Sequence, residues 1–299
     1  MTEQLRRVSF CGLGDLGGPI CAALAPVHTV MAFDPRTEAL APSVALGAIA
    51  ASSPADAARD AEVHVVIVRD DEQALSCVMG ADGILTTSPA GSVLVSHSTI
   101  APETVRTLAS ASADAGVRFV DAGLSRGAGR QIGQLYAMCG GDAATIDAIR
   151  PVLDVYCSDV VRFGEIGSGM RAKLIRNALR YALWGALYEG MVLAEAAELD
   201  LAAMAQLYRG TLGMTFDDEM VISRTTMRPI ALDDPTANPE FVARMTAAVT
   251  LGWKDLDDAF LLADEFGLDL PTARAARPLY GPALGLALYE SDPEHSGAH

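Results

Sequence analysis

Four polar side chains recur at helical spacing in one stretch of the sequence: Lys173, Arg176, Asn177 and Arg180. Residues three and four apart share one face of a helix, so these groups would line a common polar wall. The stretch 164–200 begins with loop glycines and contains no proline, which predicts one long helix. A lysine one turn from a carboxamide can exchange a proton with a substrate hydroxyl, if burial and neighbouring cations lower its pKa. A solvated face that later meets a neighbouring element is the alternative interpretation.

A glycine-rich turn follows the first expected strand. The strand covers residues 7–11, and the turn 12–17 has the sequence Gly-Leu-Gly-Asp-Leu-Gly. A second strand, 29–33, leads to Asp34, twenty residues after Gly14. In a dinucleotide-binding unit the first glycine makes the tight turn, the second admits the pyrophosphate, the third allows close packing, and the acid binds the adenosine ribose. The residues expected to contact the cofactor are Gly12, Leu13, Gly14, Asp15, Leu16, Gly17 and Asp34.

The acid after the second strand bears on the choice between NAD and NADP. Asp34 would repel a 2′-phosphate and favours NAD, whereas Arg36 lies two residues on and could tolerate that phosphate. Asp15 adds a negative charge inside the phosphate-binding turn, which suits a dinucleotide only if its side chain turns to solvent. The sequence therefore predicts NAD, with NADP as the alternative.

Strand and helix patterns alternate up to residue 163, and only helices are expected after it. Such alternation predicts a doubly wound, mostly parallel Rossmann-type sheet. We therefore expect a dinucleotide-binding domain at 1–163, followed at 164–299 by an interdomain helix and an all-α domain. The further expected strands are 63–68, 92–95, 119–121, 134–139 and 159–163. One helix is expected to begin at residue 71, and others to cover 102–115, 143–155, 201–212, 240–266 and 271–288. Residues 224–239 are expected to be irregular.

Polar residues collect where three of the expected strands end. They are Arg69 with Asp70, then Ser98 with Thr99, and then the segment 121–127. Parallel strands end at one edge of a sheet, and ligands bind beyond that edge. We therefore expect the chemistry of the first domain to lie there.

The composition excludes several classes of function. A net charge of −16 without any basic run argues against nucleic acid as a partner. The apolar runs are shorter than the roughly 18 residues of a membrane helix, and residues 1–4 begin no signal peptide, so a cytoplasmic protein is expected. Five cysteines, an odd number without metal-type spacing, predict reduced thiols and neither a disulfide framework nor a zinc site. Against this background the cations around Lys173 suit a small anionic substrate.

A set of ordered motifs runs nearly the whole length of the chain. They are 12–19, Ser98-Thr99-Ile100 with Pro102, 121–127, 133–135 leading to 140–142, 167–177, and Lys254-Asp255-Leu256. With these motifs the chain resembles the β-hydroxyacid dehydrogenases, typified by 3-hydroxyisobutyrate dehydrogenase and tartronate semialdehyde reductase. The resemblance implies NAD(P)-linked oxidation of a small 3-hydroxy acid, and an all-α domain that helps to form homodimers or tetramers.

The resemblance also implies roles for single residues. Lys173 would be the catalytic acid and base, and Asn177 its partner one helical turn on. Thr99 would lie near the nicotinamide. Contacts to the substrate are implied for Ser125, Arg126, Gly127 and Asp255, and further contacts to the cofactor for Arg69, Thr99 and Lys254.

Departures from the family pattern narrow these expectations. Gly123 replaces a usual proline, and Arg126 replaces a common glycine. The two arginines, Arg126 and the nearby Arg130, predict that the substrate carries a second anionic group. The alternative is that these arginines form salt bridges with the acidic surface of the protein. Residues 69–70 occupy positions where the family usually has an apolar residue and a proline. The contact between residue 69 and the cofactor is therefore expected to come from the backbone. Arg180 occupies the position of an acid in decarboxylating 6-phosphogluconate dehydrogenases, which argues against that reaction.

Two other functions stay open. Imine reductases share this two-domain plan and use NADPH, but they generally lack a lysine at the position of Lys173. A cofactor-binding protein without turnover is the other alternative, against which the pairing of Lys173 with Asn177 argues. His28 and His64 are expected to be structural, while the role of His97 is open because of its nearness to Thr99.

Overall fold

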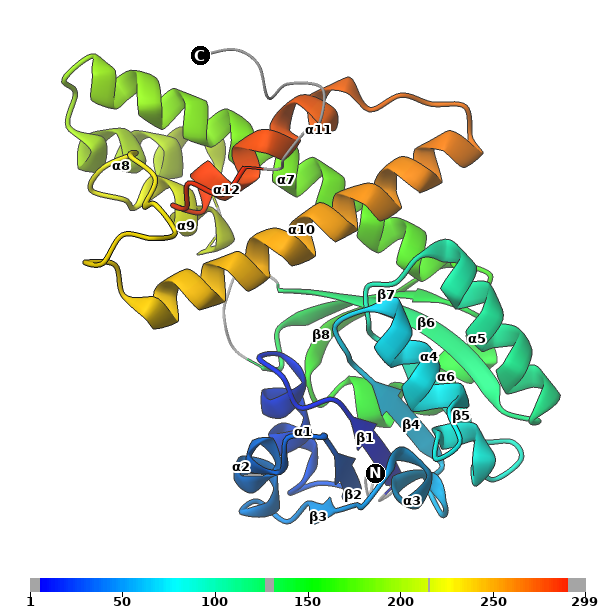
Figure 1. Cartoon of the computed structure of the whole chain (residues 1–299). Coiled ribbons are helices and arrows are strands. Elements are labelled where there is room, and N and C mark those ends of the chain that lie inside the picture. Colours follow the sequence, from blue (N-terminus) through cyan, green and yellow to red (C-terminus); the bar gives the residue numbers. More distant parts are fainter. Residues whose placement is uncertain (1–5, 127–131, 215, 290–299) are drawn as a thin grey trace. The chain divides into compact units, whose positions relative to one another are not determined.

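The chain folds into two compact units that divide inside one long helix. They are Met1–Lys173, built around a sheet, and Leu174–His299, which is helical (Figure 1). We call them the sheet unit and the helical unit. The computed structural model describes residues 6–126, 132–214 and 216–289.

The sheet unit contains, within its described residues, an eight-stranded sheet of order β3-β2-β1-β4-β5-β6-β7-β8. Neighbouring strands are parallel, apart from β6 and β7, which pair antiparallel. This confirms the doubly wound, mostly parallel sheet that the strand and helix alternation predicts. The strands are β1 (Arg7–Cys11), β2 (Thr29–Phe33), β3 (Ile49–Ala50), β4 (Val63–Val66), β5 (Val93–Ser96), β6 (Arg118–Arg126), β7 (Leu135–Gly140) and β8 (Cys157–Gly164).

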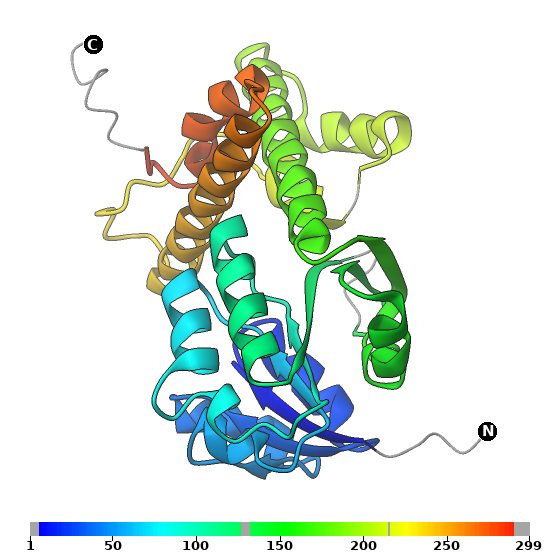
Figure 2. The same ribbon diagram turned by 90° about the vertical axis from the view of Figure 1, so that its right-hand side faces the viewer.

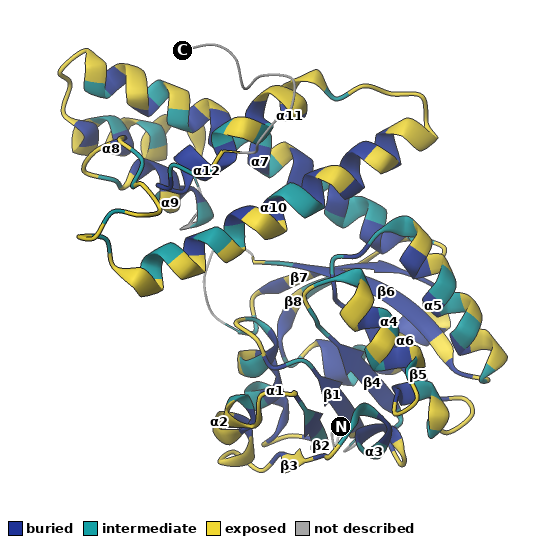
Figure 3. Ribbon diagram, viewed as in Figure 1, coloured by how far each residue is buried: buried dark blue, intermediate teal, exposed yellow. Residues whose placement is uncertain are grey.

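Helices cover both faces of this sheet. Apolar side chains of α1 (Gly17–Leu24) and α6 (Ala143–Leu153) share one buried cluster with the strands, while those of α4 (Asp71–Met79) and α5 (Pro102–Asp114) share a second. Strands β4 and β5 are therefore buried along their whole length, as Figure 3 shows. The short helices α2 (Ala41–Val44) and α3 (Pro54–Ala58) and the strand β3 were not expected from the sequence.

Strand β6 is longer than the sequence indicates. A short strand 119–121 followed by a polar loop was expected. The predicted loop is wrong, because the strand continues to Arg126, with residues 121–126 paired to β7. The last residue of β5, Ser96, pairs with Asp121, so the second half of β6 extends beyond the carboxyl end of its parallel neighbour. Antiparallel pairing with β7 satisfies the backbone groups that β5 no longer reaches. A rigid strand therefore stands where a loop was predicted.

The helical unit is built on two long helices. Helix α7 (Ser168–Ala196) confirms the long helix predicted from 164–200, and it lies beside α10 (Pro239–Glu265) in a shared core (Figure 2). Trp184 stacks on Tyr280 with ring centroids 5.8 Å apart. No described helix of the chain is long and apolar enough to cross a membrane. The shorter helices are α8 (Leu201–Leu212), α9 (Glu219–Ile222), α11 (Pro271–Ala276) and α12 (Tyr280–Ala283).

The last predicted helix is wrong beyond Ala283. A helix over 271–288 was expected, but Pro278 and Pro282 interrupt it, because proline has no amide proton for the helical ladder. The chain then turns at Gly285, whose φ is +91°. Leu286 forms a parallel bridge with Ile230, and Arg224 donates to the carbonyl oxygen of Pro282 at 2.8 Å, so the irregular span 224–239 is anchored to the end of the unit.

Candidate active site

Lys173 lies in the second turn of α7 and reaches back to the sheet of its own unit. The side chain is half-buried, and its Nζ donates a hydrogen bond of 2.7 Å to the carbonyl oxygen of Leu124 in β6. Leu124 belongs to the part of β6 that extends past the carboxyl end of β5. The lysine is therefore positioned over the carboxyl edge of the parallel sheet, where ligands of such sheets bind.

Asp121 fixes the start of the helix that carries this lysine. Its carboxylate is fully buried and accepts hydrogen bonds from the backbone amides of Gly167, at 2.6 Å, and Met170, at 2.7 Å. Burial raises the pKa of Asp121, and these amide hydrogen bonds oppose that rise. The first amides of a helix have no partner within the helix, so a carboxylate from β6 serves as their acceptor. Sequence reasoning missed this role, since 46 residues separate Asp121 from Gly167.

The turn after β1 has the geometry that a pyrophosphate requires. Gly12 has a φ of +98°, and a Cβ there would lie 2.1 Å from the carbonyl oxygen of Ile67. A Cβ on Gly17 would lie 2.0 Å from the carbonyl oxygen of Gly12, whereas one on Gly14 would meet no atom within 4 Å. The first and third glycines are thus required by close packing, and the space over the second is open for a ligand. The residues present therefore fit a dinucleotide, with the start of α1 behind its phosphates.

Asp34 is buried at the end of β2 and already has partners. One carboxylate oxygen accepts the backbone amide of Leu13 at 2.7 Å, and Arg36 contacts both oxygens through its guanidinium. Burial opposes the ionisation of Asp34, but the hydrogen bonds from Arg36 and Leu13 outweigh it and lower the pKa. Asp15 is exposed, as dinucleotide binding requires, and its charge, like that of Glu38, acts on Arg36. Arg36 therefore stands among three carboxylates.

The other strand ends supply structural hydrogen bonds. Asp70 caps α4 by accepting the amide of Gln73 at 2.8 Å, and the amide of Arg69 donates to the Gln73 side chain at 3.3 Å. The hydroxyl of Ser98 accepts the amide of Val68 at 2.8 Å, which ties the ends of β4 and β5 together. Thr99 follows directly at the same edge of the sheet. The residues expected at this edge of the sheet do lie there, but Asp70 and Ser98 make structural hydrogen bonds with the backbone.

The end of β6 carries two of the residues expected to bind substrate. Ser125 is half-buried, and its hydroxyl donates to the carbonyl oxygen of Arg126 at 3.3 Å, while the Arg126 side chain is exposed. Gly127 and Arg130, the other members of this expected group, lie outside the described residues.

Within the helical unit, Asn177 is oriented by two side chains. Its Nδ2 donates to the buried carboxylate of Asp255 at 2.8 Å, and its Oδ1 accepts from Arg176 at 3.1 Å. The hydroxyl of Tyr181 donates to the same Asp255 oxygen at 2.9 Å. Lys254 pairs with Asp258 at 2.8 Å. Asp255, expected as a substrate ligand, thus holds the amide of Asn177 in one orientation.

The two arginines of the polar helix face are paired with carboxylates of the helical unit. Arg180 forms an ion pair with the buried Asp218, which also accepts a hydrogen bond from Trp184 at 2.9 Å. Arg176 lies 3.6 Å from Asp217. Burial lowers the pKa of Arg176, the neighbouring Arg180 adds to this, and Asp217 opposes it. These pairings partly cancel the positive field that the sequence alone suggested.

The three described histidines are all hydrogen-bonded within the sheet unit, His28 through its Nε2 to the carbonyl oxygen of Pro151 at 3.1 Å. His64 bridges the hydroxyls of Ser9 and Ser92, each at 2.9 Å. His97 donates from Nδ1 to the carbonyl oxygen of Ala122 at 2.6 Å, so its Nε2 accepts from the hydroxyl of Tyr156. Burial lowers the pKa of both imidazoles to about 4. His97, whose role the sequence left open, is therefore a neutral core residue.

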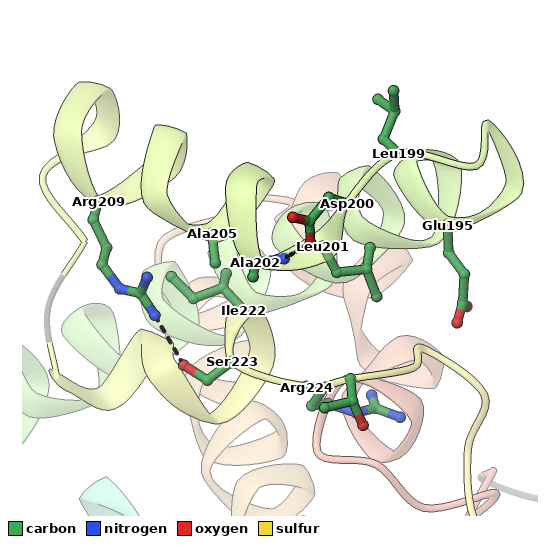
Figure 4. Close-up of a pocket in the computed structure, with 11 residues that line it drawn as sticks. Glu195, Leu199, Asp200, Leu201, Ala202, Ala205, Arg209, Ile222, Ser223 and Arg224 are labelled. Carbon is green, nitrogen blue, oxygen red and sulfur yellow. Dashed lines mark hydrogen bonds between the residues drawn. The ribbon is translucent and has the colours of Figure 1, made fainter.

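A hollow of about 470 Å³ lies in the helical unit between α8 and the residues that follow α9 (Figure 4). Arg209 at this hollow is paired with Glu219 and donates to Ser223 at 3.1 Å. Charges of both signs mix here, and none of the site residues expected from the sequence lines the hollow.

Comparisons with known proteins agree with this geometry. Residues 7–165 match the family model described as the NAD binding domain of 6-phosphogluconate dehydrogenase. An uncharacterized oxidoreductase of Mycobacterium tuberculosis is 33% identical over 289 residues, which cover 96% of each chain. The 3-hydroxyisobutyrate dehydrogenase of Pseudomonas aeruginosa is 33% identical over 208 residues, covering 69% of this chain and 70% of that one. The crystal structure of a 3-hydroxyisobutyrate dehydrogenase from Salmonella typhimurium has a TM-score of 0.76 at 25% identity, covering 91% of this chain and 92% of that chain.

Proposed function

We propose that Lys173 is the general acid and base of an enzyme whose family is clear. The chain belongs to the family of 6-phosphogluconate and 3-hydroxyisobutyrate dehydrogenases, and it is therefore an NAD(P)-dependent oxidoreductase of hydroxy acids. The reaction we propose moves a hydride between the nicotinamide and a small 3-hydroxy acid or its aldehyde or keto form. We assign the dinucleotide-binding domain to residues 1–163, and the interdomain helix with the all-α substrate and oligomerisation domain to residues 164–299.

One arrangement carries this proposal: the glycine turn and Lys173 belong to the same edge of one sheet. The turn follows the carboxyl end of β1, and the register from Cys11 through Val66 and Ser96 to Asp121 shows that β6 continues past that edge. Lys173 is hydrogen-bonded to this continuation through Leu124. A dinucleotide on the turn and a proton-transferring amine would thus serve one ligand-binding edge.

The chemistry that a bound nicotinamide supplies is hydride transfer. In oxidation, the neutral amine of Lys173 takes the proton of the substrate hydroxyl, and in reduction the ammonium returns it. The carbonyl of Leu124 orients Nζ for this exchange. Asn177, one helical turn on, would bind the substrate hydroxyl, with its amide oriented by Asp255.

We propose that the cofactor is NAD rather than NADP. Asp34 is ionised and fixed by Leu13 and Arg36, and Asp15 and Glu38 add further negative charge around Arg36. A 2′-phosphate at this place would meet one guanidinium and three carboxylates, which disfavours it. Titration of the protein with NADH and NADPH, followed by nucleotide fluorescence, measures the preference.

We infer the substrate class from the residues at the end of β6. Ser125 would bind the substrate carboxylate, and the exposed Arg126 beside it would bind a second anionic group. Values of kcat/KM for matched monocarboxylates and dianionic hydroxy acids decide whether Arg126 binds substrate or forms an ion pair at the surface. If the enzyme shows no preference for the dianion, Arg126 does not bind a second anionic group.

We further propose that the chain forms a homo-oligomer through the helical unit and works in the cytoplasm. Ile175, Leu179 and Leu193 lie along α7 with 64%, 72% and 71% of their surface exposed, an apolar row that a second subunit would cover. The five cysteines are free thiols, which suits a reducing compartment. Light scattering of the purified chain measures the oligomeric state.

Replacement of Lys173 tests the proposed function. We expect Lys173→Ala to lower kcat by a factor on the order of 10² to 10⁴, since the proton loses its acceptor, and to leave NADH affinity within about twofold. Asp147→Ala, which removes an exposed charge on α6, is the control and should behave as wild type.

The assay follows reduced-nicotinamide absorbance with 3-hydroxy acids, aldehyde acids and cyclic imines. Near-normal turnover in Lys173→Ala would refute its role. Turnover with imines alone would instead support an imine reductase, and nucleotide binding without any turnover a non-catalytic protein.

A further inference from the structure

The side-chain amide of Asn177 lies between a cation and an anion of the helical unit. Its Oδ1 accepts a hydrogen bond of 3.1 Å from Nη1 of Arg176, and its Nδ2 donates one of 2.8 Å to Oδ2 of Asp255. Asn177 and Asp255 are both buried, where charges act more strongly than they do in water. The amide is therefore oriented by opposite charges at its two ends.

The reverse orientation of this amide is disfavoured at both ends. Rotation by half a turn would place Oδ1 against the carboxylate of Asp255 and the NH2 group against the guanidinium of Arg176. Two hydrogen bonds to charged groups would then be replaced by two repulsive contacts. Asp255 alone favours the observed orientation, and Arg176 adds a second preference from the other end.

Both charged groups are themselves held in place. Nη2 of Arg176 lies 3.6 Å from Oδ2 of Asp217. The hydroxyl of Tyr181 donates at 2.9 Å to the same Asp255 oxygen that Asn177 contacts. An arginine keeps its charge in proteins even where burial lowers its pKa, as it does for Arg176. The cation beside Oδ1 is therefore present at every pH at which the enzyme is folded.

This arrangement leaves Asn177 with one group for a ligand. A carboxamide has two N–H donors, and within the described residues the structure gives an acceptor, Asp255, to one of them. The second N–H is buried, and a buried donor without an acceptor is costly unless a ligand supplies one. At the other end, the guanidinium polarises Oδ1 and makes it a poor acceptor for a substrate proton. Asn177 therefore meets a ligand as a hydrogen-bond donor.

We propose that Arg176 is a positioning residue for Asn177, and that the pair selects a ligand whose contacting atom is a hydrogen-bond acceptor. The oxygen of a hydroxy acid, or of its aldehyde or keto form, meets this condition. The N–H of a protonated imine or of an ammonium group does not, because two donors would face each other. The inference rests on the proposed role of Asn177 in binding the substrate hydroxyl, and it names the class of atom that this residue accepts.

Three ligands of similar shape test this selection without turnover. 3-Hydroxyisobutyrate carries a hydroxyl, isobutyrate a hydrogen atom and 3-aminoisobutyrate an ammonium group at the same carbon. In calorimetry with NADH bound, the wild-type enzyme should bind the hydroxy acid roughly fivefold more tightly than isobutyrate, and the ammonium analogue most weakly. In Arg176→Met the advantage of the hydroxyl should fall to about twofold or less, with the affinity for isobutyrate unchanged.

Two results of this titration would overturn the proposal. The first is a wild-type enzyme that shows no advantage of the hydroxyl, or that binds the ammonium analogue as tightly as the hydroxy acid. The second is an advantage of the hydroxyl that stays the same in Arg176→Met. A merely structural role of Arg176 would weaken all three ligands alike, and would not change their order.

Kinetics of matched variants separate the charge of Arg176 from its bulk. We expect Arg176→Met to lower kcat/KM for the hydroxy acid roughly 5- to 20-fold and to leave NADH affinity within about twofold, since the glycine turn is untouched. Arg176→Lys keeps a cation and should recover at least half of this loss on a logarithmic scale. Arg244→Met, which removes an exposed cation from α10, is the matched control and should behave as wild type. Equal losses in the Lys and Met variants would contradict the proposal.

Failure of this inference differs from failure of the proposed function. Near-normal turnover in Lys173→Ala refutes the proposed function, whatever Arg176→Met does. An inactive Lys173→Ala together with wild-type binding and kinetics in Arg176→Met overturns this inference alone. If Arg176→Met does not fold, the double variant with Asp217→Asn, which removes both charges of the pair, takes its place. If neither folds, Arg176 is structural and the proposal is wrong.

Discussion

Two polar groups on one helix are held by different means. Lys173, in the sheet unit, contacts backbone: the carbonyl of Leu124 accepts its hydrogen bond, and its stem lies against the backbone of Gly123. Asn177, in the helical unit, is positioned by the side chains of Asp255 and Arg176. Backbone groups neither titrate nor change rotamer, whereas a side-chain network depends on the protonation and packing of each member. The two groups should therefore respond differently to substitution.

The largest expected difference between the two units is the loss of folding stability at acidic pH. The described histidines all lie in the sheet unit, and burial lowers the pKa of His64 and His97 to about 4 from 6.5. Below pH 6.5 the unfolded chain binds protons that the folded unit excludes, so stability falls as the pH drops from 6.5 towards 4, and above 6.5 this contribution is absent. At pH 5 each histidine should lower the free energy of unfolding by roughly 2 kcal/mol, together roughly 4 kcal/mol.

Urea unfolding at pH 7.5 and 5.0 measures this difference. Trp184 and Trp253, the tryptophans of the chain, lie in the helical unit, so their fluorescence follows that unit while far-UV circular dichroism follows both. At pH 5.0 the dichroism should be lost at lower urea than the fluorescence. His64→Gln should remove about half of the pH dependence of the sheet unit. Equal stability at the two pH values would show that the histidines do not act in this way.

Asp121→Ala should be the most damaging single substitution at the start of α7. It leaves the amides of Gly167 and Met170 without their buried acceptor, and we expect a loss of about 3 kcal/mol in the free energy of unfolding. Asp142→Ala, which removes the exposed cap of α6, is the matched control and should cost about 1 kcal/mol. Similar losses for the two variants, measured by urea unfolding, would refute the special place of Asp121.

A smaller effect is expected at the side-chain network of the helical unit. Asp255→Asn keeps the shape of the side chain but weakens its acceptance of hydrogen bonds from Asn177 and Tyr181, at a cost of roughly 1 to 2 kcal/mol. Turnover should fall with NADH affinity unchanged. Asp257→Asn, in the same helix, weakens an exposed ion pair with Arg277 and serves as the control. Equal kinetic effects of the two variants would mean that Asp255 does not orient Asn177.

The sequence predicted the local features of the fold well. Helices α7 and α8 and the strand, turn and helix of the dinucleotide-binding unit follow from helical periodicity, glycine spacing and the acid after β2. These patterns are visible because each depends on residues close together in the chain. The antiparallel extension of β6 was missed, because its partner strand and not its own composition makes it a strand.

The residue types at the candidate site were determined by the sequence itself: a lysine and an asparagine one helical turn apart, a glycine turn, and an acid after the second strand. Only the tertiary structure decided what holds them. Asp121 meets Gly167 across 46 residues, and Asn177 meets Asp255 across 78. The reason is physical: a buried polar group takes whichever partner the packed fold brings within hydrogen-bond distance, and no local pattern encodes that choice. The contact between Gly123 and the stem of Lys173 is of the same kind, since it forms only once the first turns of α7 pack on β6.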